Sequence, residues 1–190
     1  MAKKYLEIRW HGRGGMGAKT GALLLGEAMM QQGKYIQAFP EYGPERRGAP
    51  VTAYNRIADE PIRIHYGIKS PDVIMVLDPT LLNTEKVWTG VREDTIFIVN
   101  SGLGPSELKE KFNIKNKLFV VNATGISESI IGRNLPNTPM LGAFVKATDA
   151  LPFEEFIRSV EERLRMKYKE DIVLKNLEAI KKAYEEVKEA

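Results

Sequence analysis

A glycine-rich segment near the start of the chain has the residue types and spacing that bind anions. It reads HGRGGMG, and Gly12, Gly14 and Gly17 fit the pattern G-x-G-x-x-G. The residues before it, 5–10, alternate as in a strand, and strong helix formers follow over 18–32. Glycines between a strand and a helix allow a tight turn and let backbone N–H groups approach an anion at the positive end of the helix.

Three interpretations of this segment differ in what the loop binds. Arg13 favours a phosphate or a carboxylate, because a guanidinium beside exposed N–H groups clamps such anions. A dinucleotide site would need an acidic residue at the end of the second strand, and Glu41 lies near that distance but beyond Pro40, inside a loop. Lys19 comes one residue too late for a P-loop, so an NTPase is a weak alternative. Close strand–helix packing without any ligand also stays open.

A second segment, EYGPERRG over residues 41–48, combines a rigid backbone with planar and charged side chains. Tyr42, Arg46 and Arg47 are of the types enriched at protein interfaces and anion sites. A solvated surface turn is the alternative. If the strands before the two loops run parallel, both loops lie at one edge of the sheet and form one anion-facing surface.

The remaining pattern predicts a layered α/β domain with a mixed, mostly parallel sheet. We expect a second strand over 35–39 and an antiparallel hairpin of 51–57 with 61–65. Further apolar strands are expected over 72–78, 95–99 and 118–121, with helical segments at 79–86, 125–131 and 139–150. Two amphipathic helices, 153–168 and 172–188, form a helical tail over 151–190 of one domain that spans 1–190.

Composition excludes several classes of function. The 190 residues contain no cysteine, which excludes disulfides, a thiolate nucleophile and a thiolate-bound iron–sulfur cluster within this chain. His11 and His65 are the two histidines, so we expect no metal site. A net charge of +3 without a basic stripe argues against nucleic acid as a partner. No apolar stretch reaches the roughly 20 residues of a membrane span, and no secretory segment is evident, so we expect a cytoplasmic protein.

No set of residues has the spacing of a complete active site, and we assign no catalytic residue. His11 directly precedes the glycine loop, but a structural histidine is the simpler interpretation. His65 is expected to face solvent at the end of a hairpin strand. No Ser–His–Asp spacing or close carboxylate pair stands out.

The two loops in combination are familiar. The chain resembles the gamma subunits of the 2-oxoacid:ferredoxin oxidoreductases, and the pyruvate enzymes most. The resemblance covers most of the chain. It is carried by the segments GRGGMG (12–17), FPEYGPERRG (39–48), VTAYNRIADEPI (51–62), PDVIMVLD (71–78) and NTPMLGA (137–143). Members of the family usually have Gln where this chain has Met16, so any ligand contact there would come from the backbone.

The resemblance implies a three-layer, Rossmann-like domain that acts as one subunit of a larger enzyme. Such enzymes catalyse the coenzyme A-dependent oxidative decarboxylation of a 2-oxoacid to an acyl-CoA and pass the electrons to ferredoxin. Their thiamine diphosphate and magnesium are held by alpha and beta subunits, and their iron–sulfur clusters by beta and delta subunits. The gamma subunit is implicated in assembly and in closing over coenzyme A, and it holds no cofactor of its own.

The residues that we expect to face coenzyme A or a partner subunit lie in the two loops. They are Gly12, Arg13, Gly14, Gly15 and Gly17, together with Arg46 and Arg47. Two alternatives remain: a stand-alone dinucleotide-binding oxidoreductase, and a purely structural subunit that touches no ligand. The 2-oxoacid is left open, with pyruvate as the expectation from the family.

Overall fold

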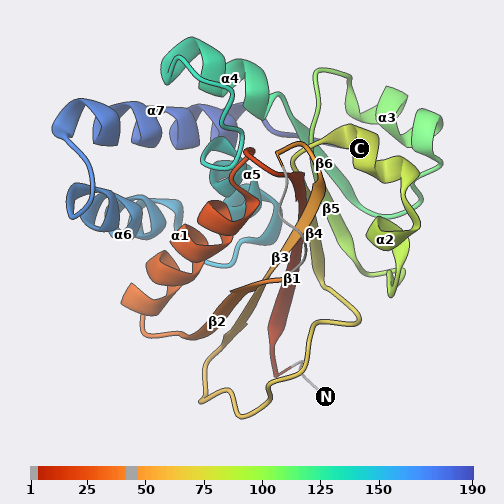
Figure 1. The fold of residues 1–190 in the computed structure, drawn as a ribbon, viewed down its shortest axis with the longest axis horizontal. Helices are drawn as coiled ribbons and strands as arrows, with labels where there is room; N and C mark the ends of the chain where they lie inside the picture. The colour runs from red at the N-terminus through yellow and green to blue at the C-terminus, as the bar shows by residue number, and fades with distance from the viewer. Residues whose placement is uncertain (1–3, 42–46) are drawn as a thin grey trace.

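One sheet with helices on both faces forms the frame of the molecule (Figure 1). The computed structural model describes residues 4–41 and 47–190. Within these residues the sheet has seven strands in the order β2-β3-β1-β4-β5-β6-β7. The strands are β1 (Leu6–Arg13), β2 (Tyr35–Pro40), β3 (Pro50–Ala58), β4 (Val73–Val76), β5 (Ile96–Asn100), β6 (Leu118–Val121) and β7 (Lys188–Glu189).

The direction of the strands confirms the mixed, mostly parallel sheet predicted from the sequence. Neighbouring strands β1, β4, β5 and β6 are parallel, whereas β3 is antiparallel to both β1 and β2, and β7 is antiparallel to β6. Because β1 and β2 both oppose β3, they point the same way. Their carboxyl ends, from which the two loops leave, therefore lie at the same edge of the sheet.

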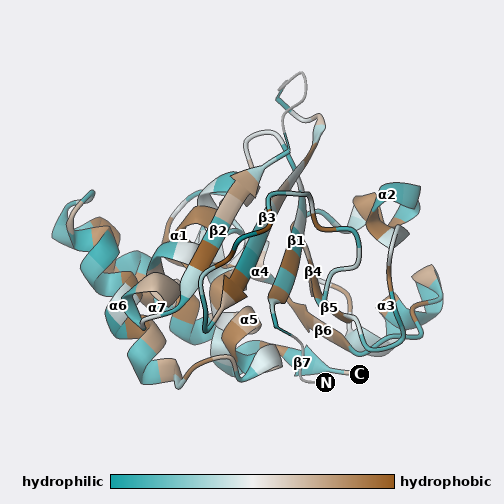
Figure 2. Cartoon of the chain, turned by 90° about the horizontal axis from the view of Figure 1, so that it is seen from below, coloured by the Kyte–Doolittle hydropathy of each residue, from teal (hydrophilic) through white to brown (hydrophobic). Residues whose placement is uncertain are grey.

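Helices cover the two faces of the sheet unequally. One hydrophobic cluster lies between the sheet and α1, α4, α5, α6 and α7, and a second lies between the other face and η1, α2 and α3. Figure 2 shows the apolar strands enclosed between helices with hydrophilic outer surfaces, which gives the three layers. The bounds are α1 (Ala18–Gln31), the 3₁₀ helix η1 (Pro79–Asn83), α2 (Glu85–Trp88), α3 (Pro105–Phe112), α4 (Ala123–Ile130), α5 (Pro139–Thr148), α6 (Phe153–Arg165) and α7 (Glu170–Glu186).

A buried polar bridge fixes α1 on the sheet. The indole N–H of Trp10 in β1 donates to Asn55 Oδ1 in β3 over 2.8 Å, and Asn55 Nδ2 donates to the carbonyl of Ala22 in α1 over 2.7 Å. Trp10 is fully buried. A Cβ on Gly21 would lie 3.0 Å from the Trp10 ring, so glycine there permits the close approach of α1 to β1.

The hairpin predicted between 51–57 and 61–65 is wrong. β3 pairs with β1 on one side and with β2 on the other, which leaves it no free edge for another strand. Residues 61–65 instead form an irregular segment, which is held where Gln37 Nε2 donates to the carbonyl of Ile64 over 2.8 Å. The true hairpin is β2–β3, and the charged loop connects its strands.

The two C-terminal helices predicted from periodicity are confirmed, and they belong to the main hydrophobic cluster. α6 packs against α1, and α7 packs against α4 and α5. The expected helical tail is thus part of the layered core. The sequence prediction missed α3 and β7, and the helical segment expected over 79–86 divides into η1, after the Asp78 N-cap, and α2.

The contact between α5 and α7 is close enough to test. A Cβ on Gly142 would lie 2.1 Å from the carbonyl oxygen of Ile180, so Gly142→Ala forces the helices apart. We expect this variant to lower the free energy of unfolding by about 2 kcal/mol, as overpacking does, in urea titrations followed by circular dichroism. Gly102→Ala is the control, because a Cβ there would meet nothing within 4 Å. Equal stability of the two variants would contradict the described packing.

Candidate functional site

The candidate site lies where connections from neighbouring strands leave the sheet on opposite faces. α1 follows β1 and packs in one hydrophobic cluster, whereas η1 and α2 follow β4 and pack in the other. In open α/β sheets such a switch point creates a crevice at the carboxyl ends of the strands, and ligands bind there. The glycine loop borders this crevice.

The glycine loop has the strand–turn–helix context predicted from the sequence. Gly15 and Gly17 have φ values of 100° and 80°, which residues other than glycine rarely adopt. Gly17 is the N-cap of α1, and this position has no side-chain cap for the first-turn N–H groups. A Cβ on Gly12 would lie 3.1 Å from Leu77 Cδ1, so β1 and the end of β4 approach closely at this point.

Arg13 is held by three partners from two other segments, the turn after β4 and the charged loop. Its Nε donates to Asp78 Oδ2, its Nη2 to Thr80 Oγ1 over 2.8 Å, and its Nη1 to the carbonyl of Gly48 over 3.2 Å. Burial alone would raise the pKa of the Asp78 carboxyl, but hydrogen bonds from Thr80 and Arg13 outweigh it and lower that pKa. The charge of Arg13 is therefore shared with a carboxylate, and contact between Arg13 and an external anion stays a prediction.

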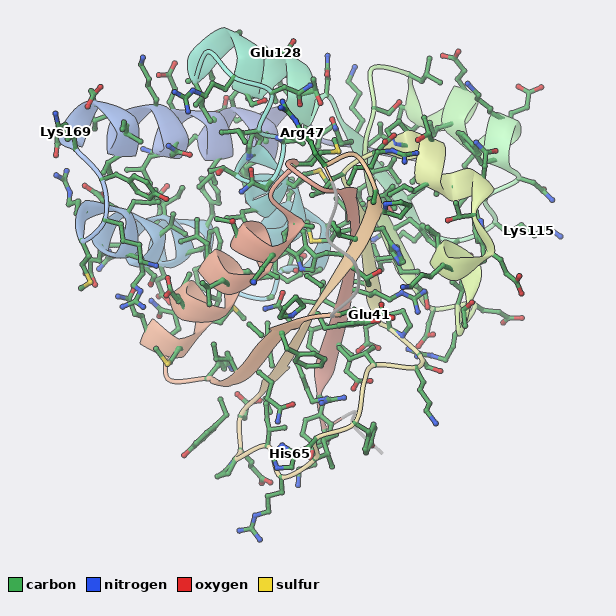
Figure 3. All side chains as sticks on the ribbon, viewed as in Figure 1. Glu41, Arg47, His65, Lys115, Glu128 and Lys169 are labelled. Carbon is green, nitrogen blue, oxygen red and sulfur yellow. The ribbon has the colours of Figure 1, made fainter. Side chains whose placement is uncertain are left out.

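The charged loop returns directly onto the glycine loop. Gly14 N–H donates to the carbonyl of Ala49 over 2.9 Å, and Gly48 N–H donates to the carbonyl of Gly14 over 3.0 Å. Arg47 is exposed and lies at this junction (Figure 3). Arg46 falls outside the described residues. The two loops thus meet at one edge of the sheet, as the sequence predicted for parallel strands.

Glu41 holds the start of the charged loop in place, and it does not occupy the position of the acidic residue in a dinucleotide site. Lys86 Nζ lies 2.7 Å from Glu41 Oε2, and the Tyr54 hydroxyl donates to the same oxygen over 3.1 Å. The hydrogen bond from Lys86 lowers the pKa of Glu41, and burial together with Glu41 raises the pKa of Tyr54 to about 12. β3 also separates β1 from β2, so Glu41 does not follow a strand adjacent to β1 as in a dinucleotide-binding unit.

Neither histidine belongs to the cleft. His11 is buried and its Nε2 accepts a hydrogen bond from Arg9 Nε over 2.9 Å. Burial and the charge of Arg9 lower the pKa of His11 to about 3, so the ring is neutral and structural, as predicted. His65 is exposed, and Figure 3 shows it at the end of the molecule away from Arg47. Within the described ranges no group of three or more His, Asp or Glu side chains could hold a metal ion.

A cleft of about 1010 Å³ opens beside the glycine loop. Its walls come from the first turns of α1, the returning charged loop, the segment 131–138, the end of α6 and the start of α7. Of the described residues that line it, seven are basic and three acidic. The basic ones are Arg13, Lys19, Arg47, Arg133, Arg163, Lys167 and Lys175, and the acidic ones are Glu27, Glu41 and Asp171.

Comparison with known proteins identifies the family. Residues 7–186 match the family model of pyruvate ferredoxin/flavodoxin oxidoreductase. The chain is 46% identical over 188 residues to pyruvate synthase subunit PorC of Thermotoga maritima, with 99% of this chain and 97% of the relative covered. It is 48% identical over 181 residues to the pyruvate/ketoisovalerate oxidoreductases common subunit gamma of Thermococcus litoralis, with 95% and 96% covered.

A solved structure shares the fold over the whole length. The crystal structure of pyruvate oxidoreductase subunit PORC from Thermotoga maritima superposes with a TM-score of 0.86 at 43% identity and covers 99% of both chains. The chain belongs to the pyruvate ferredoxin/flavodoxin oxidoreductase family. Within this family it falls with the gamma (PorC) subunits, because those relatives match it from end to end. The resemblance stated from the two loops is thereby confirmed.

Sequence reasoning missed one wall of the cleft in this gamma-type chain. Arg163 near the end of α6 and Lys167 just after it lie 2.8 and 3.2 Å from Glu27 Oε1 in α1, and all three side chains line the cleft. Arg133, in the segment between α4 and α5, and Lys175 in α7 add exposed charge. Amphipathic periodicity predicted that α6 and α7 pack on the core. It could not predict which of their charged residues border a cleft.

The bond between Arg13 and Asp78 should make stability depend on pH. We expect Asp78→Asn to lower the free energy of unfolding at pH 7 by about 1.5 kcal/mol. A carboxyl whose pKa is depressed by folding stabilises above its unfolded pKa of about 3.9, so the difference from wild type should shrink as pH falls below 4. Urea titrations at pH 7 and pH 3 measure it.

Asp59→Asn is the matched control for that experiment. Asp59 also pairs with a basic residue, Lys34, but its side chain is 84% exposed, and exposed pairs contribute little. A change within 0.5 kcal/mol at both pH values is expected. If Asp78→Asn behaves in the same way, the loops do not depend on the contact with Arg13.

Proposed function

We propose that this chain serves a multisubunit 2-oxoacid:ferredoxin oxidoreductase as its gamma subunit and binds coenzyme A in the cleft beside the glycine loop. In the reaction of such enzymes a 2-oxoacid is oxidatively decarboxylated to an acyl-CoA, with electrons passed to ferredoxin. Membership of the gamma branch of the family supports the subunit assignment. The cleft, which has an excess of basic residues and borders the N-terminus of α1, supports the ligand.

The division of labour follows from the composition. The chain has no cysteine, so thiolate-bound iron–sulfur clusters must lie in other subunits of the enzyme. We assign thiamine diphosphate and magnesium to the alpha and beta subunits, and the clusters to the beta and delta subunits. We expect the whole assembly in the cytoplasm; among the described residues no helix is long and apolar enough to cross a membrane.

The cleft suits a long anion with an uncharged arm. The first-turn N–H groups of α1 and the exposed Lys19 and Arg47 can meet phosphates, since a helix N-terminus and basic side chains both favour negative charge. Leu23, Tyr168 and other apolar residues line the part that lies toward α6 and α7. Coenzyme A has this form, with phosphates at one end and a neutral pantetheine arm at the other. The cleft volume of about 1010 Å³ is of the order that is usual for ligand pockets.

In this proposal Arg13 and Arg47 have different tasks. Arg13 holds the glycine loop against Asp78 and Gly48, so that the N–H groups of the loop keep their position. Arg47 is exposed beside that loop and is assigned the contact with phosphate. Arg46, its neighbour in sequence, is assigned either the same patch or an inter-subunit ion pair.

The choice of 2-oxoacid is assigned to the other subunits. The relative from Thermococcus litoralis is named as a subunit common to pyruvate and ketoisovalerate oxidoreductases. A gamma subunit that two such enzymes share cannot be what distinguishes their substrates. By analogy we propose that this chain recognises the co-substrate that all these reactions have in common.

Arg47→Gln in the assembled enzyme tests the ligand assignment. We expect the KM for coenzyme A to rise about tenfold with kcat within twofold, because one charge-assisted contact made in both ground and transition states is lost. Steady-state kinetics at saturating 2-oxoacid measure both constants. Lys115→Gln is the control, since Lys115 is exposed on the side of α3, away from the cleft (Figure 3). An unchanged KM with dissociating subunits would instead favour a purely structural subunit.

Isolation of the native chain tests the subunit assignment itself. We expect it to co-elute with other chains and with iron, measured by mass spectrometry and metal analysis of the same fraction. Recovery as an iron-free, partnerless chain that binds NAD(H) or NADP(H) tightly in calorimetry would favour a stand-alone dinucleotide-binding protein.

A further inference from the structure

The segment between β3 and β4 has the pattern of a strand but no strand to pair with. Residues 61–65 read PIRIH, in which two half-buried isoleucines alternate with exposed Arg63 and His65. No turn or bend interrupts this run. Over residues 62–68 no backbone N–H group donates a hydrogen bond to the described part of the chain. The alternation that predicts a strand is therefore present, while none of the described strands pairs with it.

Two side chains of the sheet hold this segment by its carbonyl groups. Gln37 Nε2 in β2 donates to the carbonyl of Ile64 over 2.8 Å, and Arg56 Nη2 in β3 donates to the carbonyl of Tyr66 over 3.0 Å. Arg56 is fully buried, and its guanidinium carbon lies 5.3 Å from the centre of the Tyr66 ring. Alternate residues of an extended chain direct their backbone groups to opposite sides, so the N–H and C=O groups of the intervening His65 face away from both contacts.

This outer side of the segment has the features of a protein-binding edge. An extended segment with free backbone groups is a template on which a strand of another chain can pair. Tyr66 at its end is 60% exposed, and tyrosine and arginine are enriched at protein interfaces. Figures 1 and 3 show the segment at the end of the molecule away from the glycine loop, and none of its residues lines the cleft. A chain bound at this edge would therefore use a surface separate from the cleft.

The charges on the segment favour a different chain over a second copy of this one. Antiparallel pairing of two copies about Arg63 or Ile64 would place basic side chains opposite each other, which destabilises a ladder. Pairing about Ile62 would bring Pro61, which has no N–H group, into the ladder. Arg63 is exposed and has no ion pair among the described residues. The partner that complements this edge is a strand with a carboxylate opposite Arg63.

We infer that residues 61–65 become a strand in the assembled enzyme by pairing with an acidic edge strand of another subunit. The inference rests on the proposed function in one respect, that this chain is a gamma subunit, and it does not involve coenzyme A. Gln37 and Arg56 keep the segment extended before the partner binds, which lowers the entropy cost of ordering it on binding. Arg63 then selects a partner strand that carries negative charge.

Amide hydrogen exchange of the assembled enzyme and of the isolated chain tests the pairing. We expect the amides of Arg63 and His65 to exchange at least about tenfold more slowly in the assembled enzyme, because ladder hydrogen bonds protect them. Equally fast exchange in both samples would overturn the inference and leave the proposed function standing, since the enzyme has assembled. Protection in the isolated chain that rises with its concentration would assign the edge to a second copy and also overturn it.

Arg63→Glu in the assembled enzyme tests the charge of the partner. We expect the gamma chain to dissociate on dilution at an about tenfold higher concentration, followed by mass photometry, because attraction to a carboxylate becomes repulsion. Arg158→Glu, at an exposed position in α6, is the matched control and should stay within twofold of wild type. The thermal midpoint of the isolated chain should be the same for both variants, since both side chains are exposed.

The other outcomes separate this inference from the proposed function. Equal dissociation of the two variants would overturn the acidic partner strand, while the gamma-subunit assignment would stand. A wild-type chain that is recovered without any partner would overturn both.

Discussion

The edge of the sheet that carries the site depends on one side chain, that of Arg13. It joins the glycine loop to the turn after β4 through Asp78 and Thr80, and to the returning charged loop through Gly48. These segments meet where β1 and β4 end, so without a shared partner each would have to be ordered separately at a cost in conformational entropy. Arg13 orders them together, and the carboxylate of Asp78 largely neutralises its positive charge.

This arrangement leaves the attraction for an anion to other groups. The first turn of α1 contributes N–H groups, and Lys19 and Arg47 contribute exposed charge at the cleft. The sequence could identify Arg13 as a residue type that clamps anions. It could not show that Asp78, 65 positions later, already occupies the guanidinium.

Much of the fold could be predicted from local pattern. β1, the glycine turn and α1 follow from alternation, from glycines and from a run of helix formers, all within one stretch of chain. The hairpin failed because the partners of β3 depend on tertiary pairing on both of its edges. α3 was missed because it buries little more than Leu108 and is otherwise charged, which leaves a weak apolar period.

The candidate site was predictable on one side only. The glycine loop and Arg47 come from motifs near the start of the chain and meet through hydrogen bonds between Gly14 and Gly48. The other wall is assembled from Arg133, Arg163 and neighbouring residues, more than 100 positions after the glycine loop. The packing of α6 against α1 brings Arg163 into place, and no local spacing encodes that contact.

The bridge that fixes α1 on the sheet has an optical consequence. Trp10 lies fully buried against Gly21, one helical turn from Gly17, and its indole N–H is committed to Asn55. Trp88, the second of the two tryptophans, packs against Phe97 on the opposite face of the sheet. The chain therefore carries a natural fluorophore beneath its glycine loop and another remote from it. A change at the N-terminus of α1 therefore acts on the environment of Trp10 and leaves that of Trp88 unchanged.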